Sequence, residues 1–100
     1  RGSLHVIAEI QSGNAALCAV LPTRTVRHRA DILIGFPDTL HLGLVDGALI
    51  RCEPFVFHNA CKLTKDGSLS PALLCRVHRV IEREMDARRV EAGVAKYLVR

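Results

Sequence analysis

Short aliphatic runs that end at turn-forming residues are the feature that most constrains how this chain can fold. Val, Ile and Leu gather in short stretches, and Gly, Pro, Asn or Asp separate these stretches along most of the sequence. Turn residues that recur at roughly ten-residue intervals are typical of a small all-β barrel or sandwich. With 100 residues, the chain can form one domain with a modest core.

Four segments have the pattern of β-strands, namely residues 4–10, 15–21, 26–34 and 48–58. The turn residues at 12–14 predict a tight turn between the first two segments. Because side chains on a strand alternate between its two faces, the parity shared by the first, third and fourth segments assigns one set of residues to the core. This predicted core consists of Val6, Ile32, Ile34, Ile50 and Val56.

The last third of the chain is compatible with two structures. Ser70 and Pro71 form a favourable helix start, and apolar residues follow at helical spacing. Residues 74–81 could equally form the strand that closes a barrel. We divide the segment into a strand that ends at about residue 81 and a helix over residues 82–97, in which acidic and basic residues lie one turn apart.

The order of these elements predicts an OB-fold, a five-stranded Greek-key β-barrel, with a short connector helix at residues 39–44 and a C-terminal helix. We assign residues 4–81 to the all-β OB-fold barrel and residues 82–100 to the C-terminal helix. Residues 1–3 read Arg-Gly-Ser without an initiating Met, and we interpret them as a remnant of cloning.

Three turn positions within this order resemble the bacterial single-strand-binding type of OB-fold: the turn after the first strand, Gly35 and Gly47. The stretch Ile10-Gln11-Ser12-Gly13 more narrowly resembles the OB-fold proteins of the kinetoplastid mitochondrial RNA-editing complex, the editosome. That resemblance implies a non-catalytic mitochondrial subunit that binds single-stranded RNA and docks other OB-fold subunits. The chain departs from the family at residues 22–25, where the usual RNA-contacting loop is longer.

A second resemblance is to the OB-folds of initiation factor one and ribosomal protein S-one, through Asp31-Ile32 and residues 45–50. It implies an alternative function, that of an RNA-binding domain in the translation machinery. Residues 35–44 contain no Lys or Arg, although that family carries basic residues there.

The basic residues favour a polyanionic partner. The chain carries 14 Lys and Arg against 10 Asp and Glu, a net charge of +4. Arg24, Arg27 and Arg29 form a dense cluster, in which the last two would lie about 7 Å apart on one face of a strand. An exposed aromatic residue beside an arginine is suited to base stacking. The predicted RNA-contacting residues are Arg24, Arg27, Arg29, Arg51, Phe57 and Lys62, and we expect weak, sequence-tolerant binding.

Metal binding and catalysis have little support in the sequence. His58 and Cys61, and Cys75 and His78, are spaced like two halves of a zinc site. Residues three apart on a strand point to opposite faces, however, so we expect free thiols and neither a metal nor another cofactor. A nucleophile elbow, a phosphate-binding glycine loop and a paired-carboxylate motif are all missing from the sequence. We therefore predict a protein without enzymatic activity.

A surplus of apolar positions predicts a docking surface. A contiguous group of exposed apolar residues marks an interface, and open strand edges can pair with another chain. The predicted partner-binding residues are Leu40, Leu42, Leu44, Val94 and Leu98. We expect docking to other OB-fold subunits, self-association of the isolated chain, and no membrane partner because no apolar run approaches ~18 residues. In the alternative interpretation, the C-terminal helix only packs against its own barrel.

Overall fold

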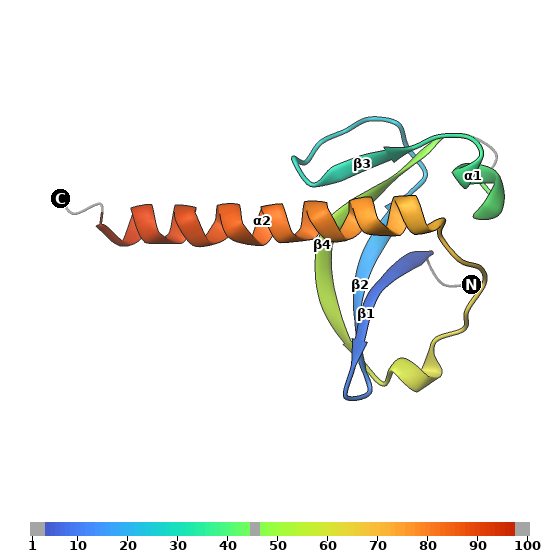
Figure 1. The fold of residues 1–100 in the computed structure, drawn as a ribbon, viewed down its shortest axis with the longest axis horizontal. Coiled ribbons are helices and arrows are strands. Elements are labelled where there is room, and N and C mark those ends of the chain that lie inside the picture. The colour runs from blue at the N-terminus through green and yellow to red at the C-terminus, as the bar shows by residue number, and fades with distance from the viewer. Residues whose placement is uncertain (1–3, 45–46, 98–100) are drawn as a thin grey trace.

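The computed structural model describes residues 4–44 and 47–97, and for residues 94–97 it describes the backbone alone. Within these ranges the chain forms β1 (His5–Gln11), β2 (Asn14–Leu21), β3 (Asp31–Ile34), α1 (Asp38–His41), β4 (Ala48–His58), the short 3-10 helix η1 (Ala60–Lys62) and α2 (Pro71–Tyr97). The four described strands form one antiparallel sheet in the order β1-β2-β4-β3. The sheet curls, and α2 crosses it and continues well beyond it (Figure 1).

Register shifts explain the curl. One shift lies between Ile7 and Glu9 of β1. The other lies in β4, because Ala19 pairs with Arg51 whereas Leu17 pairs with Phe55, which leaves extra residues on β4. Extra residues in one strand of an antiparallel pair bend that strand and increase its local twist.

The hairpin between β1 and β2 confirms the predicted turn. Gln11 pairs with Asn14, and the two residues between them, Ser12 and Gly13, have φ angles of 52° and 79°. Two consecutive residues in the left-handed region form the turn whose twist matches that of a hairpin, and Gly adopts this conformation without a steric penalty.

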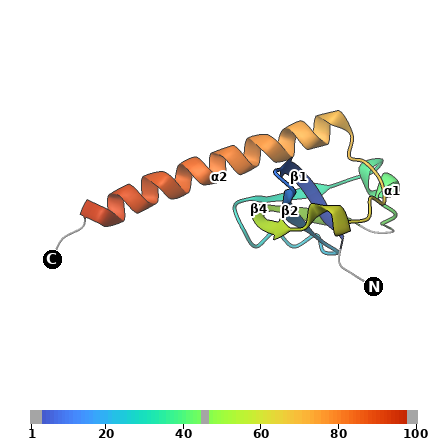
Figure 2. The same ribbon diagram turned by 90° about the horizontal axis from the view of Figure 1, so that it is seen from below.

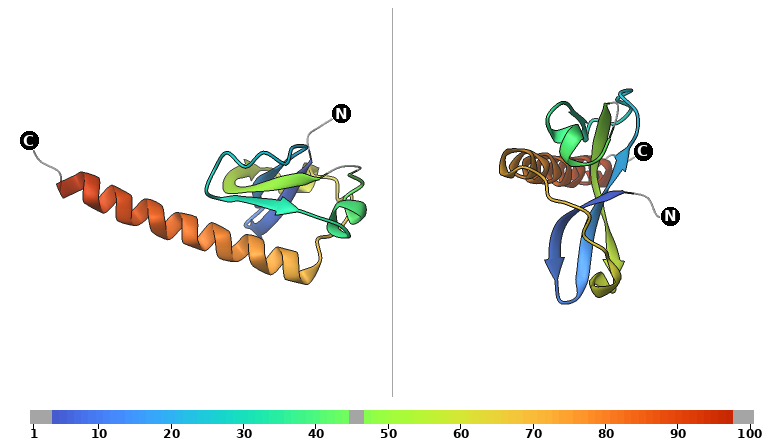
Figure 3. Two further views of the ribbon diagram at one scale, coloured as in Figure 1. Left: turned by 90° about the horizontal axis from the view of Figure 1, so that it is seen from above. Right: turned by 90° about the vertical axis from the view of Figure 1, so that its right-hand side faces the viewer.

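The core lies between α2 and the face of the sheet that it covers, which we call the inner face. Leu73, Val77 and Val80 of α2 belong to one buried cluster together with inner-face residues of all four strands. Figures 2 and 3 place α2 on one side of the sheet only. We call the other side the outer face.

Four of the five predicted core residues are buried as expected: Val6, Ile32, Ile34 and Ile50. Val56 was assigned to the core incorrectly, because its side chain is 60% exposed. Its pairing with Ala16 places it on the inner face, as the parity indicated. The end of β4 that carries it extends away from α2, so nothing from the helix covers it (Figure 1).

The predicted fifth strand is wrong, because residues 74–81 lie within α2. The all-β, five-stranded barrel is therefore replaced by a four-stranded curled sheet with a long helix. Pro71 opens the helix, and the Ser70 hydroxyl accepts a hydrogen bond from the Leu73 N–H at 3.2 Å, which caps it. The helical spacing of Leu73, Val77 and Val80 then buries one face, whereas strand alternation would have split these residues between two faces.

The third strand is also shorter than predicted, since β3 begins at Asp31 rather than Val26. The preceding backbone N–H groups have other partners. The Asp31 carboxylate accepts hydrogen bonds from the N–H groups of Arg27 and His28, both at 3.0 Å. The Ala30 N–H donates to the His28 ring at 3.0 Å. Local side-chain acceptors of this kind compete with the ladder of a sheet.

Candidate functional site: a charged brace and an apolar sheet face

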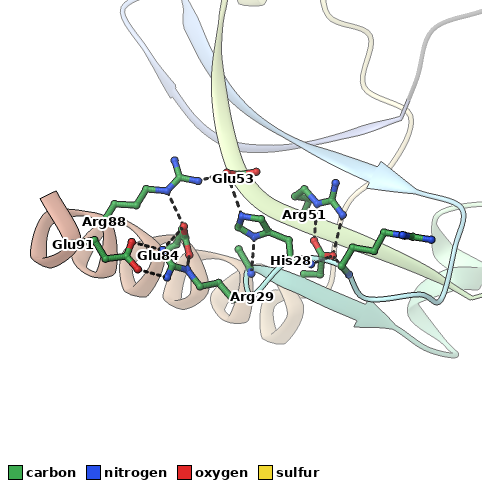
Figure 4. A network of polar contacts seen from close by, with 10 residues as sticks. His28, Arg29, Arg51, Glu53, Glu84, Arg88 and Glu91 are labelled. Atoms are coloured by element: carbon green, nitrogen blue, oxygen red, sulfur yellow. Dashed lines mark hydrogen bonds and ion pairs between the residues drawn. The ribbon is translucent and has the colours of Figure 1, made fainter. Parts of the chain in front are cut away.

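An ion-pair network, which we call the brace, joins α2 to the loop before β3 and to β4 (Figure 4). Its five members are Arg29, Glu53, Glu84, Arg88 and Glu91. The Arg29 guanidinium donates to both oxygens of Glu84, at 2.6 and 3.1 Å, and to both oxygens of Glu91, at 2.7 and 2.9 Å. Arg88 bonds Glu84 at 2.7 Å and also bonds Glu53. The brace thus fixes the direction in which α2 leaves the sheet.

Glu84 is the centre of the brace. Only 5% of it is exposed, and two guanidinium groups share its carboxylate. The hydrogen bond from Arg29 lowers the pKa of Glu84 to about 2, against the opposing effect of burial. A carboxylate that is ionised and doubly paired when buried satisfies its hydrogen-bonding capacity, which a lone buried charge could not do.

A second ion pair lies on the outer face. Arg51 donates to Asp31 through Nε at 2.8 Å and through Nη2 at 3.0 Å. This bond lowers the pKa of Asp31 to about 2, although burial of the carboxylate acts in the opposite direction. The side chain of Asp31 is fully buried, so the pair leaves no free charge from Asp31 on this part of the sheet.

One group of side chains approaches the geometry of a metal site. His28, Glu53 and Glu84 place ligand atoms within 4.8 Å of one another. The Nδ1 atom of His28 accepts the Ala30 N–H, which assigns the ring hydrogen to Nε2, the atom 3.4 Å from Glu53. A metal would need the lone pair at Nε2, and arginines already bind both carboxylates. We therefore assign the two carboxylates to the brace, with His28 beside them.

The cysteine and histidine pairs with zinc-like spacing are engaged differently. His78 contacts the Ala8 carbonyl at 2.7 Å through Nε2, and His58 contacts Asn14 at 3.2 Å. Cys61 and Cys75 are exposed free thiols. Burial raises the pKa of the other two thiols, to about 11 for Cys18 and about 12 for Cys52.

The outer face carries an apolar patch, which we call the outer patch and define as Ile7, Ile10, Phe55 and Phe57. Leu17 pairs with Ile7 on one side and with Phe55 on the other. Ala15 pairs in the same way with Ile10 and Phe57. Directly paired residues of an antiparallel sheet share a face, so the four side chains lie in two adjacent rows across three strands.

The outer patch is accessible. Ile10 is 61% exposed and Phe55 is 47% exposed. The Phe55 ring also meets the His5 ring edge to face, with centroids 5.5 Å apart. One patch residue, Ile7, also lines a cavity of about 620 Å³ between β1 and the segment Lys62–Leu69, whose wall includes Val6 and Val20 of the inner face.

The predicted RNA-contacting residues do not form one continuous surface. Arg29 and Arg51 are held by carboxylates, and Phe57 belongs to the outer patch. The remaining three cations, Arg24, Arg27 and Lys62, are exposed and make no ion pair with any described residue. Their contact with RNA stays a prediction.

The predicted partner-binding residues are divided in the same way. Leu40 is exposed, whereas Leu42 and Leu44 are partly buried against the core cluster. Val94 lies in α2, where only the backbone is described, and Leu98 lies outside the described residues. Exposed apolar side chains therefore lie both at the connector, where Phe36 is 82% and Leu40 is 64% exposed, and on the sheet.

Sequence analysis missed a row of arginines on α2, Arg76, Arg79 and Arg83, which we call the arginine stripe. All three side chains are exposed. Positions i, i+3 and i+7 of a helix share one side, so the spacing was visible in the sequence. The signal was lost because residues 74–81 were assigned to a strand.

Comparisons with protein-family models, with curated proteins and with solved structures find no match for this chain. None of the helices within the described residues has the length and apolar character needed to cross a membrane. The brace, the outer patch and the arginine stripe are the features of the described residues that bear on function.

Proposed function

We propose that this protein is a non-catalytic docking module whose outer patch binds an apolar segment of a partner protein. The observation that supports this most directly is the position of the patch on the face opposite α2. Strand pairing brings four large apolar residues together on this face, and α2, the long helix of the described residues, lies on the other side of the sheet. Three of them, Ile7, Ile10 and Phe55, are at least 36% exposed, and contiguous apolar patches on monomers are often functional.

Charge favours an apolar partner segment. The nearby cation on this face, Arg51, is already bonded to Asp31, so the patch offers no free ionic contact from that side chain. Association at the patch itself should therefore depend little on salt, unlike electrostatic binding.

Area favours a heterologous partner over a second copy. A stable interface buries about 800 Å² on each partner, which is more than the patch supplies alone. A partner segment that also enters the cavity between β1 and the segment Lys62–Leu69 would add to that area. β1 is an edge strand of the described sheet and borders this cavity, so an extended segment could pair with it.

The narrower assignment to an OB-type docking subunit of a mitochondrial RNA-editing complex is part of the proposal and depends on the resemblance of Ile10-Gln11-Ser12-Gly13. The alternative remains an RNA-binding domain of the translation machinery. The four-stranded sheet departs from both, because each resemblance implies a five-stranded barrel.

Site-specific photo-crosslinking in cells that express the full chain tests the docking function. A photoreactive phenylalanine analogue replaces Phe55, and the matched control places it at Val90, an exposed apolar residue of α2. We expect one discrete adduct with a different protein from position 55, which still forms when a lysate is brought to 0.5 M salt before irradiation, and a much weaker adduct from position 90. The second substitution Ile10→Asp should abolish the adduct while the circular-dichroism spectrum stays unchanged. Equal adducts at both positions, or an adduct only with a second copy of this chain, would refute the proposal.

A further inference from the structure

We propose that the exposed side of α2 binds the phosphodiester backbone of a nucleic acid through the arginine stripe. Arg76, Arg79 and Arg83 rise by about 10.5 Å along the helix axis from first to last. Three guanidinium groups spread over that rise can reach neighbouring phosphates of one nucleic-acid strand, whose charges recur every ~3.4 Å along a duplex axis. The site is independent of the docking function, since it shares no residue with the outer patch.

The distribution of charge supports this site. The brace and the outer-face ion pair use four carboxylates to hold arginines other than those of the stripe. Two acidic residues, Glu82 and Asp86, border the stripe, and Asp86 is bonded to Arg89. No stripe arginine makes an ion pair with a described residue. The net charge of +4 is therefore carried by unpaired cations, of which the stripe gathers three on one helix side.

The chemistry of the stripe selects phosphate and not a particular sequence. A guanidinium group can donate two parallel hydrogen bonds to two phosphate oxygens, whereas an ammonium group acts as a point charge. All three positions are arginine, and none is aromatic, so the stripe itself has no platform for base stacking. Binding should be independent of sequence and steeply dependent on salt.

Fluorescence anisotropy with the full chain tests the proposal, using a poly-U RNA of 20 nucleotides and a DNA duplex of 20 base pairs as probes. Three phosphate contacts predict that affinity for poly-U falls about 20-fold between 50 and 200 mM salt. The triple variant Arg76→Gln, Arg79→Gln, Arg83→Gln should lose that dependence and bind at least tenfold more weakly at 50 mM salt. Gln keeps a similar helix propensity, so the variant should fold, which thermal unfolding verifies.

Arg89→Gln is the matched control, because Arg89 is exposed on the same helix but already paired with Asp86. Its affinity should stay within twofold of that of the parent. Equal binding by the parent and the folded triple variant would overturn the proposal. Equal competition by poly-glutamate would also overturn it and would assign the stripe to an acidic protein. Neither result touches the outer patch, whose residues are unchanged.

Discussion

Truncation of Val77 should show how much of the fold depends on the packing of α2. Val77 is fully buried, and it belongs to the cluster that joins α2 to the sheet. Val77→Ala removes two methyl groups, worth about 1.5 kcal/mol of transfer free energy. It also leaves a cavity, so the free energy of unfolding should fall by about 2–3 kcal/mol in total. For a domain of this size, the corresponding fall in Tm is roughly 10–20 °C.

Val90→Ala is the matched control, because it makes the same substitution thirteen positions further along the same helix. Val90 is 66% exposed. Alanine has the higher helix propensity, so this variant should unfold within about 0.5 kcal/mol of the parent, or be slightly more stable. Urea unfolding followed by circular dichroism gives both values. Shifts that are equal within about 0.5 kcal/mol would refute the packing of α2 described above, because both sites would then be similarly exposed.

Two further predictions concern titration and thiol chemistry. The folded protein lowers the pKa of Asp31 and of Glu84 to about 2, whereas unfolded carboxyl groups titrate near pH 4. The stabilisation that these two carboxylates provide is complete above about pH 5 and is lost as the pH falls towards 2. The urea concentration at the midpoint of unfolding should therefore fall across that pH range, and it should fall less steeply in Glu84→Gln. An identical pH dependence in the parent and the variant would contradict the role of Glu84. A disulfide-exchange reagent should react rapidly with two thiols of the native protein, Cys61 and Cys75, and with all four thiols after denaturation. Rapid reaction of all four thiols in the native protein would contradict the burial of Cys18 and Cys52.

Local sequence patterns predicted the first half of the sheet well. The alternation of β1, the apolar run of β2 and the turn at Ser12-Gly13 are set by near neighbours, and strand parity identified Ile32 and Ile50 as core residues. The same parity predicts that Arg51, Glu53, Phe55 and Phe57 share the outward side of β4, and pairing with β2 confirms this for Arg51, Phe55 and Phe57. Glu53 was assigned incorrectly, because it lies at the register shift and bonds Arg88 of α2.

Residues 74–81 and 26–30 were assigned incorrectly because their local sequence is compatible with more than one secondary structure. Residues 74–81 satisfy both a strand and a helix pattern, and the choice was made by burial of Leu73, Val77 and Val80 against a sheet that the sequence alone does not position. Residues 26–30 alternate like a strand, but the Asp31 carboxylate binds two of their N–H groups instead.

The brace could be predicted only in part. Glu84 and Arg88 lie one helical turn apart, so their pairing is visible in the sequence. The contact of Glu84 with Arg29 spans 55 residues and arises only when α2 crosses the sheet. This contact also changes the interpretation of Arg29, from a cation available to RNA to one that holds a helix.

The two proposed surfaces differ in position and in the physical origin of their affinity. The outer patch lies on the face of the sheet that α2 does not cover, and the arginine stripe lies on the exposed side of α2 itself. The brace connects the helix to β4 and to the loop before β3, so the two surfaces belong to one folded unit. Apolar burial at the patch should persist at high salt, whereas phosphate binding at the stripe should weaken with salt. A partner protein and a nucleic acid could therefore be bound together, and raising the salt should release the nucleic acid first.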